Sequence, residues 1–140
     1  MKHVAMLSAA AFILSASITT AQTPPAQKAK FVPPVKGVAT IEVMQLPSKR
    51  VGKDMVTVYK VRNTSKGSIN LLKADEFWYD KNTKIVSGTS YAHTKGPILP
   101  GAIVEISLAS PYNAQMRQNQ VIFAHANGKV EAKSVKSMKQ

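Results

Sequence analysis

Apolar and polar residues alternate along much of the chain after residue 37, and this alternation is typical of strands rather than helices. The clearest example is residues 103–108, where Val104, Ile106 and Leu108 share one face and polar side chains share the other. Similar patterns predict further strands at residues 38–46, 55–62, 69–79, 84–87, 121–126 and 129–133. About seven short strands with closely spaced turns predict an all-β fold, either an antiparallel β-sandwich or a closed barrel.

Turn-forming residues separate the predicted strands. The Pro-Gly pair within residues 97–101 suits a type II turn, because glycine adopts the positive φ that this turn requires. Asn-Gly at residues 127–128 favours a type I′ hairpin turn for the same reason. Residues 110–116 begin with Ser-Pro, which predicts the start of a short helical turn. A change in the alternation at Val61 predicts a β-bulge.

The two ends of the chain differ from this body. Residues 1–21 combine an early lysine, an apolar run and small residues before Gln22, which predicts a signal peptide cleaved at that point. A membrane anchor is the alternative, but the apolar run is shorter than the roughly 20 residues that span a bilayer. Residues 22–37 contain two Pro-Pro pairs and predict an extended linker, and residues 134–140 predict a flexible basic tail. The predicted domain is residues 38–133 of a periplasmic or secreted protein, without a transmembrane segment after cleavage.

Composition narrows the chemistry available to the chain. The absence of cysteine excludes disulfides, thiol catalysis and the acylated cysteine of a bacterial lipoprotein. The chain carries 19 basic residues against 7 acidic ones, a net charge of +12. More than half of the excess in the exported chain lies in residues 22–36 and 129–140. The charge therefore predicts a weak, salt-sensitive attraction to anionic surfaces.

Three segments resemble a known family. Residues 61–65 (VRNTS), 78–80 (WYD) and 99–101 (LPG) are similar to the pattern of the FxLYD-type domain, with Glu76 and Trp78 at the positions of its Phe and Leu. The resemblance covers residues 38–108. It implies a bacterial extracytoplasmic immunoglobulin-like β-sandwich, a class of domain with no agreed enzymatic role.

The sequence Phe77-Trp78-Tyr79 is an aromatic cluster in a predicted strand. Because neighbouring strand residues face opposite sides, we expect Trp78 to point into the core and Phe77 and Tyr79 to face outward beside Tyr59. Exposed aromatic rings bordered by basic residues suit binding to sugars, peptides or bases. The alternative is that the linker around Phe31 covers these rings. The predicted interaction surface comprises Tyr59, Lys60, Arg62, Phe77, Tyr79 and Lys81.

The same alternation places Glu76 on the core side of its strand. A buried carboxylate requires a cation or hydrogen-bond donors, and we expect a bulge or a strand edge to turn Glu76 outward instead. His93 and His125 are distant in the sequence and no acidic cluster accompanies them. We therefore expect no metal and no cofactor.

The sequence contains no Gly-x-Ser-x-Gly elbow and no glycine-rich phosphate loop. We therefore expect a non-catalytic protein-interaction or assembly module of the bacterial cell envelope. Its protein partner would bind at a strand edge or an apolar sheet face. The alternative is an electrostatic binder of polyanions such as nucleic acid, lipopolysaccharide or acidic glycans.

Overall fold

The computed structural model describes residues 30–139, which form eight strands and no helix. The predicted signal peptide and residues 22–29, half of the predicted linker, lie outside the described residues. The all-β prediction is confirmed for residues 30–139. The strands are β1 (Ala39–Gln45), β2 (Lys49–Val51), β3 (Asp54–Asn63), β4 (Lys73–Tyr79), β5 (Ile85–Ala92), β6 (Ile103–Pro111), β7 (Gln118–His125) and β8 (Gly128–Ser134).

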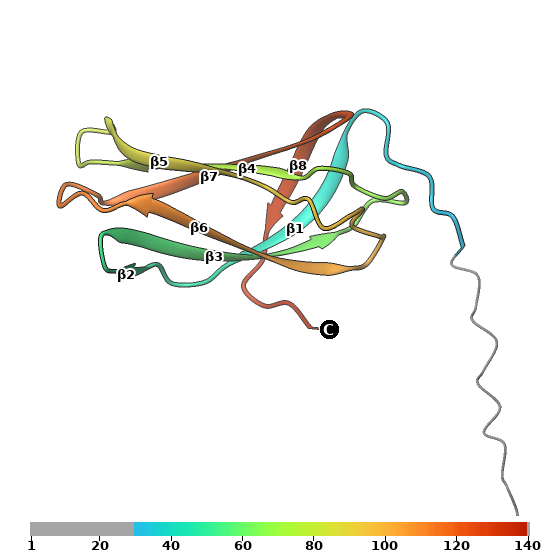
Figure 1. Ribbon diagram of the computed structural model, residues 1–140, viewed down its shortest axis with the longest axis horizontal. Helices are drawn as coiled ribbons and strands as arrows, with labels where there is room; N and C mark the ends of the chain where they lie inside the picture. Colours follow the sequence, from blue (N-terminus) through green and yellow to red (C-terminus); the bar gives the residue numbers. More distant parts are fainter. Residues whose placement is uncertain (1–29, 140) are drawn as a thin grey trace, which may run out of the picture. The chain divides into compact units, whose positions relative to one another are not determined.

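These strands form one curled sheet in the order β2-β3-β1-β8-β7-β4-β5, with β6 paired to β3. The sheet folds back on itself, so that β4, β5 and β7 lie opposite β3 and β6 (Figure 1). Strand β8 connects the two halves: it pairs with β7 only near Gly128 and then runs alongside β1. The β1–β8 pair is parallel, so the prediction of a purely antiparallel arrangement is wrong at this pair.

The core lies between the two halves of the curled sheet. Burial alternates along the strands. In β4 the side chains of Ala74, Glu76 and Trp78 are buried, and their neighbours are half-buried or exposed. The predicted inward position of Trp78 is confirmed, since the side chain is 7% exposed. Tyr59 and Phe123 meet edge to face across the core, with ring centroids 6.4 Å apart. Burying such large rings contributes a few kcal/mol each.

Two predicted strand boundaries are wrong. The strand expected at residues 69–79 begins only at Lys73, because Leu71 has a φ of 49° and interrupts the extended backbone. Ile69 instead pairs with Ile98 in an isolated bridge. The short strand expected at residues 84–87 continues as β5 to Ala92.

Three predictions of local geometry are also corrected. No helical turn follows Ser110, because β6 continues to Pro111 and Ser110 is buried inside the sheet. The register of β3 is regular at Val61. The irregularity lies between β4 and β5, where Trp78 pairs with Ser87 and Tyr79 with Ile85, so that Val86 of β5 is the extra residue. The β7–β8 hairpin forms as predicted, but it is not type I′, because Gly128 has a positive φ and Asn127 does not.

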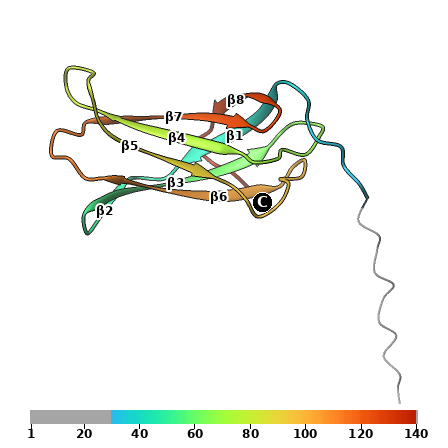
Figure 2. The ribbon, with the colours of Figure 1, turned by 45° about the horizontal axis from the view of Figure 1, so that its top comes forward.

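Residues 32–37, here called the strap, are not a free linker. Val35 donates a backbone hydrogen bond to Ser68 at 2.8 Å, and Ser68 donates one to Pro33 at 3.0 Å. Gly37 donates to the carbonyl of Asn127 at 3.2 Å. The strap therefore connects residues 67–68 to the β7–β8 hairpin (Figure 2).

The predicted flexible tail also contacts the sheet. Beyond the end of β8, the amide of Val135 donates to the carbonyl of Val43 at 2.9 Å. Farther along, the guanidinium of Arg62 donates to the carbonyl of Lys139. The described part of the tail is therefore bound along β1 and β3.

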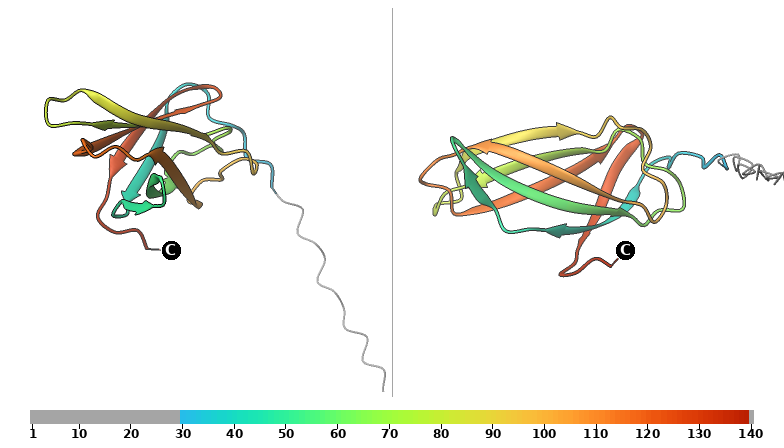
Figure 3. Two further views of the ribbon diagram at one scale, coloured as in Figure 1. Left: turned by 60° about the vertical axis from the view of Figure 1, so that its left-hand side comes forward. Right: turned by 60° about the horizontal axis from the view of Figure 1, so that its bottom comes forward.

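The alternating direction of the strands sorts the loops into two groups at opposite ends of the domain. The β2–β3 turn, the β4–β5 turn and the β6–β7 loop lie together at one end, here called the tip (Figures 1 and 3). The other end, here called the strap end, carries the strap, residues 64–72, residues 93–102 and the β7–β8 turn. Residues distant in the sequence therefore share an end.

Candidate functional site

The predicted interaction surface does not assemble, because Tyr59 faces the core. Its side chain is 0% exposed. Phe77 and Tyr79 are half-buried and lie on the face of β4 that points away from the core. The prediction of an outward Tyr59 is wrong because its hydroxyl finds a buried acceptor in Glu76, which allows the phenol to enter the core. Phe31, which the alternative placed over these rings, is itself 80% exposed.

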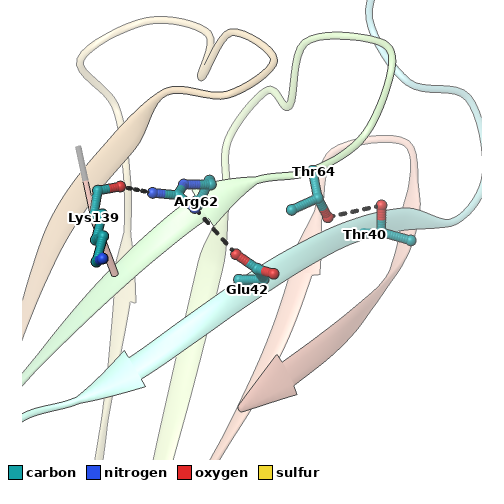
Figure 4. Close-up of polar contacts among 5 residues, drawn as sticks. All are labelled: Thr40, Glu42, Arg62, Thr64 and Lys139. Atoms are coloured by element: carbon teal, nitrogen blue, oxygen red, sulfur yellow. Dashed lines mark hydrogen bonds and ion pairs between the residues drawn. The ribbon is translucent and has the colours of Figure 1, made fainter. Parts of the chain in front are cut away.

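The basic residues of that prediction are dispersed as well. On the outer face of β3, Lys60 lies 3.8 Å from Glu105 and Arg62 lies 3.4 Å from Glu42. Figure 4 shows Arg62 between Glu42 of β1 and the carbonyl of Lys139. Beside this pair, the hydroxyl of Thr64 donates to that of Thr40 at 3.1 Å (Figure 4). Lys81 lies elsewhere, in the β4–β5 turn.

A fully buried carboxylate, Glu76, lies at the centre of the core. The Tyr59 hydroxyl donates to its Oε1 at 2.9 Å and the Ser110 hydroxyl donates to its Oε2 at 2.8 Å. The Asn119 amide donates to Glu76 Oε1 and to the Tyr59 oxygen, both at 2.9 Å. Gln45 in turn donates to Asn119 Oδ1 at 3.1 Å. The prediction that Glu76 turns outward is wrong. Neutral donors from three other strands form hydrogen bonds with its carboxylate inside the core.

This network has a structural role. Burial raises the pKa of the Tyr59 phenol, and the negative charge of Glu76 and the hydrogen bond to it raise that pKa further. Tyr59 therefore stays protonated and remains a donor. Both Glu76 and Tyr59 are 0% exposed, so neither can contact a substrate in this conformation. The network connects β3, β4, β6 and β7.

The raised pKa of Tyr59 predicts a specific loss of stability in alkali. An unfolded tyrosine titrates near pH 10, so folding keeps Tyr59 protonated above that pH and its stabilising effect declines from there upward. At neutral pH we expect Tyr59→Phe to lower the free energy of unfolding by about 1–2 kcal/mol. Above pH 10 the difference between the two proteins should shrink by about 1.4 kcal/mol per pH unit. Urea titrations from neutral to alkaline pH measure it, and a constant difference would contradict the proposed linkage.

The two described histidines have separate environments. His125 Nε2 lies 2.7 Å from the carbonyl of Gly37 and helps to hold the strap. His93 is 8% exposed, and its Nδ1 has no hydrogen-bond partner in the structure. Residues 30–139 contain no group of three or more His, Cys, Asp or Glu side chains placed to share a metal ion. Within the same residues, no helix has the length and apolar character needed to cross a membrane.

Exposed basic side chains gather at the tip from all three of its loops. The acidic residues in these loops are Asp54 and Asp80, and the Asp80 carboxylate accepts the amides of Asn82 and Lys84 at 2.8 and 2.9 Å. None of the basic residues forms an ion pair with an acid within residues 30–139. The basic tip comprises Lys49, Arg50, Lys53, Lys81, Lys84 and Arg117.

Backbone contacts hold the three loops of the tip together. The amide of Tyr112 donates to the carbonyl of Lys53 at 2.8 Å, and the amide of Arg117 donates to that of Tyr79 at 2.8 Å. The guanidinium of Arg50 lies 3.9 Å from the centre of the Tyr112 ring. These contacts fix the relative positions of the loops before any ligand binds.

The sequence analysis missed the basic tip because it counted charge along the chain. The usable signal was the position of the basic residues relative to the strands. Residues 49–53, 81–84 and 117 all fall at turns separated by an even number of antiparallel strands, which places them at one end. The comparison of the chain with protein-family models and with curated proteins found no match.

Proposed function

We propose that this chain is a non-catalytic binding module, exported to the bacterial cell envelope, that holds an anionic polymer or surface by electrostatic attraction. The observation that carries this proposal is the basic tip, where six exposed basic residues stand among two acidic ones. Like charges are kept close together at a cost in stability, and an anionic ligand relieves that repulsion. The rest of the fold serves as a rigid support.

The outer face of β3 supports the assignment to the tip. On β3 the two basic side chains Lys60 and Arg62 already pair with carboxylates. The tip lacks such pairs, and Lys53, Lys81 and Lys84 are exposed at its turns. Charges within a Debye length of about 8 Å from a ligand act together, so clustered cations attract an anion more strongly than scattered ones.

The salt dependence of binding tests this function. Residues 22–140 contain the whole compact unit that begins at Phe31 and are the protein to use. We expect their affinity for heparin to fall about 10³-fold between about 50 and 200 mM salt, as it does when about six cations contact an anionic polymer. Uncharged dextran of similar length is the control and should not bind. Binding to both polymers, or heparin binding that ignores salt, would contradict the proposal.

A protein partner is the second candidate function, and an apolar groove favours it. The groove has a volume of about 400 Å³ on the outer face of β3 and is lined by Leu46, Pro47, Lys49, Val51, Val56 and Val58. A partner held in this groove would stay bound at high salt, because burial of apolar surface does not depend on charge. Capture of one protein at high salt by residues 22–140, lost on Val58→Asp, would favour this candidate over the first. The kinship with FxLYD-type immunoglobulin-like domains stays a prediction.

A further inference from the structure

We infer that the anionic partner of the basic tip is the headgroup surface of an anionic lipid membrane, an inference that rests on the proposed function. Each loop of the tip carries one exposed apolar or aromatic side chain next to its cations. Val51, at the end of β2 beside the β2–β3 turn, is 60% exposed. Ile85 beside the β4–β5 turn is 53% exposed, and Tyr112 of the β6–β7 loop is 37% exposed. A soluble polyanion would bind the cations without needing these side chains.

A membrane surface uses both kinds of side chain at once. Lysine and arginine bind the anionic headgroups, and each raises the affinity for such a surface about fivefold. Short apolar side chains between them enter the boundary between headgroups and acyl chains. Tyrosine favours this boundary, because its ring is apolar and its hydroxyl is polar. Arg50, which lies over the Tyr112 ring, places a cation and a ring side by side at that depth.

The shape of the tip also suits a flat partner. Its cations extend from three separate loops, and Lys53, Lys81 and Arg117 come from one loop each. A nucleic-acid strand is bound along a groove that follows its backbone, with bases stacked on aromatic rings. Tyr112 is the only aromatic residue in these loops, and Arg50 already lies over its ring. A group of separate loop ends therefore fits a flat membrane surface better than it fits a nucleic-acid strand.

The strap end provides a matched comparison. It also carries lysines, at positions 36, 66, 95 and 129, and exposed apolar side chains at Leu71 and Leu99. It has fewer cations than the tip, and the strap occupies part of it. Three lysines can therefore be replaced at either end with the same change in net charge. Comparing the two triple replacements distinguishes binding at the tip from a general effect of net charge.

The test is co-sedimentation of residues 22–140 with phosphatidylglycerol-containing vesicles and with vesicles of phosphatidylcholine alone. We expect binding to the anionic vesicles only. The triple variant Lys53→Gln, Lys81→Gln, Lys84→Gln should bind about 100-fold more weakly. The control variant Lys36→Gln, Lys66→Gln, Lys95→Gln should lose no more than a few-fold, through its lower net charge. All six side chains are exposed, so both variants should fold, which thermal unfolding verifies.

A second variant separates the membrane from a soluble polyanion. Val51→Ser with Ile85→Ser should weaken vesicle binding about tenfold and leave heparin binding unchanged, because only the membrane receives apolar side chains. Unchanged vesicle binding by this variant, or tighter binding of wild type to single-stranded DNA than to vesicles, would overturn the membrane inference. Equal losses in the two lysine variants would overturn the tip as the site, and with it the observation that carries the proposed function. The absence of salt-sensitive binding to vesicles, heparin and DNA alike would overturn both.

Discussion

Replacing Glu76 with leucine is expected to lower the free energy of unfolding by about 3–5 kcal/mol. Leucine fills most of the volume, so the loss comes from the donors left behind rather than from a cavity. The hydroxyls of Tyr59 and Ser110 and the amide of Asn119 would all lose an acceptor in the core. A domain of this size has a total stability of about 5–15 kcal/mol, so the variant should lose a large fraction of its stability. Urea unfolding followed by tryptophan fluorescence measures the change.

Two further variants assign this loss to the network. Glu105→Leu removes an exposed carboxylate from β6 and should change stability by no more than about 0.5 kcal/mol. Tyr59→Phe combined with Glu76→Leu should cost less than the sum of the single changes, because the phenol hydroxyl is then no longer an unpaired donor. A Glu76→Leu protein as stable as wild type would show that the network does not support the core.

Gly128→Ala is expected to release the strap and to lower the free energy of unfolding by about 2–4 kcal/mol. Gly128 has a φ of 152°, and a Cβ added there would clash with the carbonyl oxygen of Gly37. The hairpin or the strap must move to accommodate it. Since the amide of Gly37 bonds to Asn127, its hydrogen exchange should accelerate in the variant.

Gly101→Ala is the matched control for this prediction. Gly101 also has a positive φ, of 78°, but no atom lies within 4 Å of an added Cβ. The control should therefore show only the strain of a left-handed alanine, about 1 kcal/mol, and leave the strap amides protected. If the two variants lose the same stability and exchange alike at Gly37, the strap is not held against the hairpin.

The sequence predicted the strands that follow simple alternation and failed where a distant contact decides the outcome. Strand β6 was predicted because Ile106 and Leu108 alternate with polar residues, and both are buried. The extension of β6 through Ser110 could not be predicted. This polar residue is accommodated in the core because its hydroxyl donates to Glu76, 34 residues away in the sequence. The start of β4 was missed because Leu71 adopts a positive φ, which leucine gives no reason to expect.

The faces of β3 illustrate the same limit. Its alternation separates Val56 and Val58 from Thr57 and Tyr59, but either pair could face the core by pattern alone. Tyr59 is inside because Glu76 accepts its hydroxyl, so the two predictions, an outward Tyr59 and an outward Glu76, were wrong together. The basic tip was within reach of the sequence, because it requires only the direction of each strand. The apolar side chains that accompany it required the structure.

Hydrogen exchange on residues 22–140 with and without phosphatidylglycerol vesicles tests the central claim, that the basic tip binds an anionic surface, most directly. It reports the amides that a ligand covers, without any substitution. We expect slower exchange at residues 49–54, 80–85 and 111–117, and unchanged exchange at residues 64–72 and 93–102 of the strap end. Protection of the strap end instead, or of neither end under conditions where the protein binds the vesicles, would contradict it.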